Sequence, residues 1–105
     1  MTTTVYLQKS TRLTKKYMVT VDGKTIHFGA MGYSDYTKHK DPDRMKLYNN
    51  RHKTREDWSK AGIETAGFWA KWILWSKPSL KEAIAYTEDK FNLEIIRSKP
   101  PKNKK

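Results

Sequence analysis

Residues 16–28 read KYMVTVDGKTIHF, and this stretch decides the fold because it encodes a β-hairpin. Asp22 and Gly23 are the preferred pair for a two-residue type I′ turn, in which both central positions need a positive φ angle. So short a turn fixes the register of the two strands, and Val19 is then expected to face Ile26. Alternation predicts a core face made of Tyr17, Val19, Ile26 and Phe28 and a more polar face made of Met18, Thr20, Thr25 and His27.

Further strands are predicted on both sides of the hairpin. Apolar segments near residues 4–8 and 93–96 are typical of edge strands in the same small antiparallel sheet. The fold class is therefore α+β, with this sheet packed against three or four helices. We expect one compact domain over residues 1–97 and a disordered basic tail over residues 98–105, because the tail has nothing to bury.

Helix starts are marked by capping residues. Asp41 before Pro42 predicts a helix to about Lys53. Thr65 and Ser79 predict two more helices, which end near residues 75 and 91. The wide aromatic stripe at Phe68, Trp69, Trp72 and Trp75 predicts that the first of these lies in the core. A capping-box pattern at Thr54 predicts a short extra helix that carries Trp58.

Composition bounds the function. The 105 residues include no cysteine, which excludes disulfides, thiolate zinc sites and a cysteine nucleophile. No apolar run approaches the ~20 residues that span a bilayer, and the N-terminus shows no signal-peptide pattern. We therefore expect no membrane span and no secretion, and an intracellular location in the cytoplasm or nucleus.

The net charge of +11 is unevenly distributed along the chain. Residues 36–55 hold seven basic and two acidic side chains, and residues 97–105 hold five basic and none acidic. Residues 56–96, in contrast, hold five basic and seven acidic side chains. This segregation favours a polyanionic partner, which is nucleic acid, an acidic protein or an acidic headgroup surface.

The catalytic patterns that the sequence offers are incomplete. His39, Asp41 and His52 are the best trio for a metal-dependent nuclease, but they lack the spacing of paired metal ligands. Tyr33, Tyr36 and Arg44, with Glu56 or Glu64, supply the residue types of another nuclease class without its motifs. We expect an exposed His39, a partly buried His52 bonded to the backbone, and neither a metal, nor a cofactor, nor a catalytic residue.

The loop that follows the hairpin is the best candidate for a binding surface. Gly29 and Gly32 are expected to turn the chain off the sheet. Asp35 in this loop has two candidate ion-pair partners, Lys38 and Arg44. In either pair its role would be to hold the shape of the loop. The predicted nucleic-acid contacts are the aromatic and basic residues of the loop, the following helix and the tail: Tyr33, Tyr36, Lys38, His39, Lys40, Arg44, Arg51, Arg55, Lys102, Lys104 and Lys105.

One combined motif carries a resemblance to a known family. It comprises HFGA-x-GY-x-DYT-x-HKD at residues 27–41, then Arg44, Tyr48, Arg51, His52 and Trp58, and TAGFW at residues 65–69. Over about residues 15–80 the chain resembles small basic proteins of unassigned function that large nucleocytoplasmic DNA viruses of algae and amoebae encode. The resemblance implies a viral setting and a role in the virion, and it supplies no catalytic residues.

These observations favour a non-enzymatic protein that binds nucleic acid without sequence preference, because no base-reading motif is present. With the resemblance, the expected polymer is viral DNA, which the protein would condense or neutralise in the particle. The alternative is a minor capsid or internal virion protein that binds an acidic partner, and a metal-dependent nuclease comes third. The sequence leaves open DNA against RNA, single against double strands, and the oligomeric state.

Overall fold

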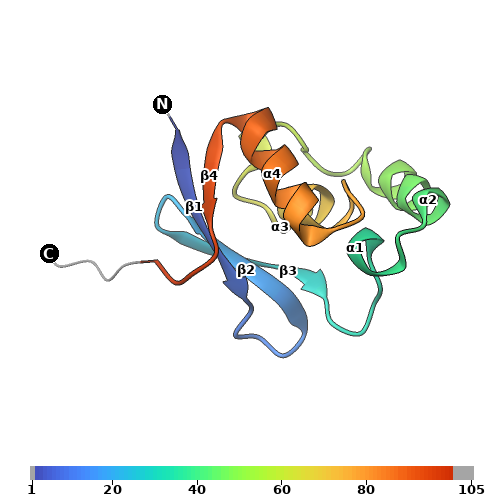
Figure 1. Cartoon of the computed structure of the whole chain (residues 1–105), viewed down its shortest axis with the longest axis horizontal. Helices are drawn as coiled ribbons and strands as arrows, with labels where there is room; N and C mark the ends of the chain where they lie inside the picture. Colours follow the sequence, from blue (N-terminus) through green and yellow to red (C-terminus); the bar gives the residue numbers. More distant parts are fainter. Residues whose placement is uncertain (1, 101–105) are drawn as a thin grey trace, which may run out of the picture.

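The computed structural model describes residues 2–100 and has the expected α+β class (Figure 1). No helix within these residues is both long and apolar enough to cross a membrane. The elements in chain order are β1 (Thr3–Lys9), β2 (Lys15–Val21), β3 (Lys24–Ala30), α1 (Tyr36–His39), α2 (Pro42–His52), the 3₁₀ helix η1 (Lys60–Gly62), α3 (Ala66–Trp69), the π-helix η2 (Ala70–Leu74), α4 (Leu80–Phe91) and β4 (Leu93–Ile96).

The hairpin of β2 and β3 has the predicted register, with Val21 opposite Lys24 and Val19 opposite Ile26. The four strands form one sheet in the order β3-β2-β1-β4. Two details of the predicted sheet are wrong. β1 lies inside the sheet instead of at its edge, and β4 pairs with β1 in parallel, so the sheet is mixed. Asn92, at φ 56°, reverses the chain directly after α4 and sends β4 along β1 in the same direction.

The core lies between one face of the sheet and the helices. Val5, Leu7, Val19 and Phe28 are buried on that face. α3 contacts β3 and α4 contacts β4, so the helices cover the sheet from its two edges. Figure 1 shows β1 and β4 side by side at one end of the molecule and α1 with α2 at the other. His27 lies on the opposite face, as predicted, where its Nδ1 is 2.7 Å from the hydroxyl of Ser10.

The helix caps follow the sequence closely. The Asp41 carboxylate accepts from the N–H of Asp43 at the start of α2, and the Ser79 hydroxyl accepts from the N–H of Glu82 at the start of α4. The short helix predicted from Thr54 is absent, since residues 53–59 form turns, bends and irregular backbone. Asp57, the acidic residue of that pattern, does not complete a capping box with Thr54, because its carboxylate accepts from the N–H and the hydroxyl of Ser59 instead.

The aromatic helix predicted over 66–75 is present and lies in the core, but its second half is a π-helix. Phe68, Trp69 and Trp72 are buried, and Trp72 packs edge-on against Phe91 of α4. The wider π turn changes the direction of the residues that follow it. Trp75 therefore leaves the Phe68 and Trp72 face and packs against α2, where it stacks on Tyr48.

Candidate nucleic-acid interface

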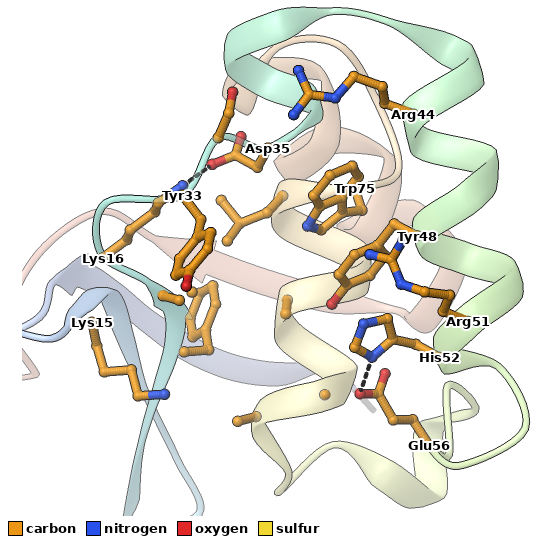
Figure 2. Close-up of a pocket in the computed structure, with 18 residues that line it drawn as sticks. Lys15, Lys16, Tyr33, Asp35, Arg44, Tyr48, Arg51, His52, Glu56 and Trp75 are labelled. Atoms are coloured by element: carbon orange, nitrogen blue, oxygen red, sulfur yellow. Dashed lines mark hydrogen bonds and ion pairs between the residues drawn. The ribbon is translucent and has the colours of Figure 1, made fainter.

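A cavity of about 510 Å³ opens between the end of the hairpin and α2, and we call it the main cavity (Figure 2). The hairpin side consists of Lys15, Lys16 and residues 28–30. The opposite side consists of residues of α2, and the helix over 66–74 closes the back. Figure 2 shows Lys15 and Tyr33 on the hairpin side and Arg44, Tyr48 and Arg51 on the α2 side.

An aromatic ladder attaches α2 to the rest of the protein. α2 itself has no fully buried residue. The Tyr48 ring lies parallel to Trp75 at 4.2 Å between centroids and stacks on His52 at 4.1 Å. The His39 ring contacts Trp75 at 5.3 Å between centroids and extends the ladder, and Tyr36 lies 6.2 Å from His39. This stacking fixes the α2 wall of the main cavity.

Tyr48 points its hydroxyl toward the main cavity (Figure 2). Burial, followed by the nearby Glu56 carboxylate, raises the pKa of Tyr48 to about 12. The hydroxyl therefore keeps its proton at neutral pH. It can donate a hydrogen bond to an anionic oxygen in the cavity.

Glu56 and His52 form a fixed pair at the lower end of the main cavity. His52 Nδ1 lies 3.0 Å from Glu56 Oε2, and the Trp58 indole N–H donates to Glu56 Oε1 at 2.8 Å. His52 is half-buried as predicted, but its partner is this side chain and not the backbone. Gly67 allows the approach, because a Cβ there would lie 2.8 Å from the Glu56 carboxyl carbon. Both carboxylate oxygens of Glu56 are thus engaged in holding the turn.

The free cations of the main cavity are Lys15, Arg44 and Arg51, which form no ion pair within residues 2–100. Lys16 differs from them, because its ammonium lies 2.5 Å from Asp35 and both side chains are buried. This contact corrects the sequence-based partners of Asp35, which were Lys38 and Arg44. The cavity therefore presents, from two opposite sides, three positive charges that have no ion-pair partner among the described residues.

A second cavity of about 470 Å³ lies on the other side of the loop over residues 31–35. Its lining includes Lys9 and Lys38, which also form no ion pair among the described residues. Four residues line both cavities: Lys16, Tyr33, Ser34 and Asp35. Tyr33 is 74% exposed, so a side chain that lines both cavities is also open to solvent.

The structure gathers some of the predicted contact residues and separates others. Tyr33, Arg44 and Arg51 line the main cavity, and Lys38 lines the second cavity. Arg55 is exposed beyond the end of α2 and lines neither cavity. Lys102, Lys104 and Lys105, with most of the tail predicted over 98–105, lie outside the described residues.

The remaining predicted contacts have partners within the protein. Lys40 donates to the carbonyl oxygen of Pro78 at 2.5 Å, which ties the loop to the start of α4. Tyr36 and His39 belong to the aromatic ladder. His39 is half-buried, against the expectation of an exposed ring, and its Nδ1 accepts from the N–H of Asp41 at 2.9 Å. Within residues 2–100, no group of three or more His, Asp and Glu side chains is placed to hold a metal ion.

Sequence reasoning missed Lys9 and Lys15 as members of the candidate interface. Each lies at the end of a strand, Lys9 in β1 and Lys15 in β2. Only the hairpin pairing, which sets Lys15 opposite Ala30, brings this end of the sheet to the loop. The two strand-end lysines were present in the sequence, but nothing local to them indicates which loop they meet.

Comparison with known proteins gives one match, to a family model described as a family of unknown function (DUF5754). It matches residues 5–52, just under half of the chain, from β1 through α2. No curated protein and no solved structure matches the chain. The matched part contains all five free cations of the two cavities, whereas Glu56, Trp75 and the helix that closes the main cavity lie outside it.

Proposed function

We propose that this protein is a non-enzymatic, sequence-tolerant nucleic-acid-binding protein. The observation that carries the proposal is the set of free cations, Lys15, Arg44 and Arg51, that face one cavity from opposite sides. Arginine forks bind phosphate oxygens in pairs, and a lysine adds a point charge. With Lys9 and Lys38 in the second cavity, five cations are available to a polyphosphate backbone.

The acidic side chains in the lining reduce this positive field but do not cancel it, because Lys15, Lys16, Arg44 and Arg51 outnumber Asp35 and Glu56. Asp35 is paired with Lys16, and the Glu56 carboxylate, held by His52 and Trp58, keeps its charge but forms no ion pair with Lys15, Arg44 or Arg51. The cations contact phosphates, which carry no sequence information, so binding is expected to tolerate any sequence. The viral setting implied by the resemblance makes viral DNA the expected polymer, and an acidic virion protein is the alternative partner.

The test is the salt dependence of binding, measured by fluorescence anisotropy with the full-length protein and a labelled oligonucleotide. Five phosphate contacts give a log–log slope of roughly −3.5 on a single strand, which is roughly a 100-fold loss of affinity between 50 and 200 mM salt. Tail lysines that also contact phosphate would steepen this slope. A protein that shows no binding at low salt does not have this function.

Charge-matched variants separate the interface from bulk charge. Arg44→Ala/Arg51→Ala removes two cavity cations, and Lys46→Ala/Lys81→Ala removes two exposed lysines that line neither cavity. The first variant is expected to reduce the slope by roughly 1.4 on a single strand, at 0.7 per contact, and the second to leave it nearly unchanged. Equal effects would show that only net charge matters. Polyglutamate should compete poorly, and effective competition by it would favour the acidic-partner alternative.

A further inference from the structure

The two cavities adjoin the loop over residues 31–35 and share Lys16, Tyr33, Ser34 and Asp35 in their linings. From this arrangement, and resting on the proposed function, we infer that they form one groove that holds an unpaired nucleic-acid strand, with a base stacked on Tyr33. The inference names the form of nucleic acid that the site selects. It depends on three observations: which cavity each free cation lines, the exposure of the Tyr33 ring, and the loop over residues 31–35 that both cavities share.

Each free cation lines one cavity only, so the free charges are divided between the two parts of this groove. Lys9 and Lys38 line the second cavity, and Lys15, Arg44 and Arg51 line the main cavity. The middle is electrically quiet, because Lys16 there is neutralised by Asp35 at 2.5 Å. A strand that crosses the loop would have phosphates near both charged parts and a base near the neutral middle. Single-strand sites combine a positive track with aromatic rings in this way.

Tyr33 is the aromatic ring at that middle point. It is 74% exposed and makes no ring contact or side-chain hydrogen bond among the described residues. Core packing therefore does not explain it, unlike Tyr17, which stacks on Phe28 at 6.1 Å. Gly32 precedes it at φ 90° and lets the chain present the ring outward. Figure 2 shows Tyr33 projecting from the loop on the side opposite Arg51.

The ring distinguishes unpaired strands from duplexes. In a duplex each base is stacked between its neighbours, so no base face is available to a side chain without unstacking. A single strand exposes base faces, and stacking on an aromatic ring is worth ~1–3 kcal/mol per base. A duplex would meet only the cations, so Tyr33 should matter for single strands alone.

The experiment measures affinities of the full-length protein for oligo-dT and for a self-complementary hairpin of equal length, by fluorescence anisotropy. We expect oligo-dT to bind more tightly. Tyr33→Ala should weaken oligo-dT binding by roughly 5- to 100-fold and leave hairpin binding within about twofold. Tyr33→Phe, which keeps the ring, should bind as the unaltered protein does. Tyr86→Ala is the matched control, because Tyr86 is also an exposed tyrosine but lines neither cavity.

The outcomes separate the two proposals. If neither nucleic acid binds at low salt, the proposed function is wrong and the groove inference goes with it. If both bind with a steep salt dependence but Tyr33→Ala affects oligo-dT no more than Tyr86→Ala does, nucleic-acid binding stands and the single-strand groove is refuted. Equal losses for oligo-dT and hairpin in Tyr33→Ala would likewise overturn the inference. Tyr33 is exposed, so its replacement should leave the fold intact, which a circular dichroism spectrum checks.

Discussion

The buried ion pair between Lys16 and Asp35 is the most sensitive point of the candidate interface, and we predict a large effect when it is broken. The two side chains are 9% and 2% exposed, with 2.5 Å between the ammonium and the carboxylate. Asp35 also accepts from the N–H and the hydroxyl of Thr37, which caps α1. Asp35→Asn keeps an oxygen for this cap and removes the charge, so it isolates the pair.

Loss of one partner of a buried pair costs ~3–5 kcal/mol, because the other charge is left without compensation. Lys16 lines both cavities, and water entering them can solvate the ammonium, so we expect the lower end, about 3 kcal/mol. Asp35→Ala also removes the cap and should cost about 1 kcal/mol more. Such a loss is a large share of the ~5–15 kcal/mol by which a domain of this size is stable.

Urea unfolding followed by tryptophan fluorescence measures these free energies, and Asp35→Asn should lower the midpoint by roughly 1–3 M. The double variant Lys16→Met/Asp35→Asn contains no buried charge at this point and should be more stable than Asp35→Asn alone. The reasoning is refuted if Asp35→Asn costs less than about 1 kcal/mol, or if adding Lys16→Met destabilises the protein further.

Two further predictions concern the loop glycines and Tyr48. Gly29→Ala should cost roughly 2–4 kcal/mol of unfolding free energy and Gly32→Ala roughly 1–2 kcal/mol. Both glycines have a positive φ, but only a Cβ at Gly29 would meet another atom, Leu74 Cδ1 at 2.8 Å. Equal urea midpoints for the two variants would contradict this prediction. Tyr48, with its pKa raised to about 12, should be the last tyrosine to ionise in an ultraviolet titration, and Tyr48→Phe should remove that step. The pKa of Tyr48 in the folded protein exceeds its unfolded value of 10, so the stabilisation from neutral Tyr48 is complete below pH 10 and is lost as the pH rises toward 12. A titration in which all tyrosines ionise near pH 10 would contradict this prediction.

The features predicted correctly from the sequence are those that depend on near neighbours. The turn at Asp22-Gly23 fixes the register of β2 and β3 through local geometry. Asp41 and Ser79 cap helices through hydrogen bonds to residues two or three positions away. The burial of Phe68, Trp69 and Trp72 follows from hydrophobic spacing alone.

The features that were missed depend on contacts between distant segments. Asp35 has charged neighbours in sequence, yet its partner is Lys16, nineteen residues earlier and placed by hairpin pairing. The π-helix at 70–74 sends Trp75 toward Tyr48, and the helical period of the sequence does not reveal the change. The interface itself is assembled from strand ends, a loop and α2, so its members could be only partly named before the fold was known.

The pairing of β1 with β4 has a consequence for how the protein is made. Thr4 pairs with Glu94, so the partner of an early strand is synthesised about ninety residues later. At ~5–20 residues per second, β1 waits roughly 5–20 s on the ribosome with one edge unpaired. β1 also carries Val5 and Leu7, which are buried on the core face of the finished protein, and an apolar strand with an unpaired edge recruits strands from other chains. The yield of folded protein should therefore depend on translation speed and on chaperones that cover this strand until α4 and β4 have emerged.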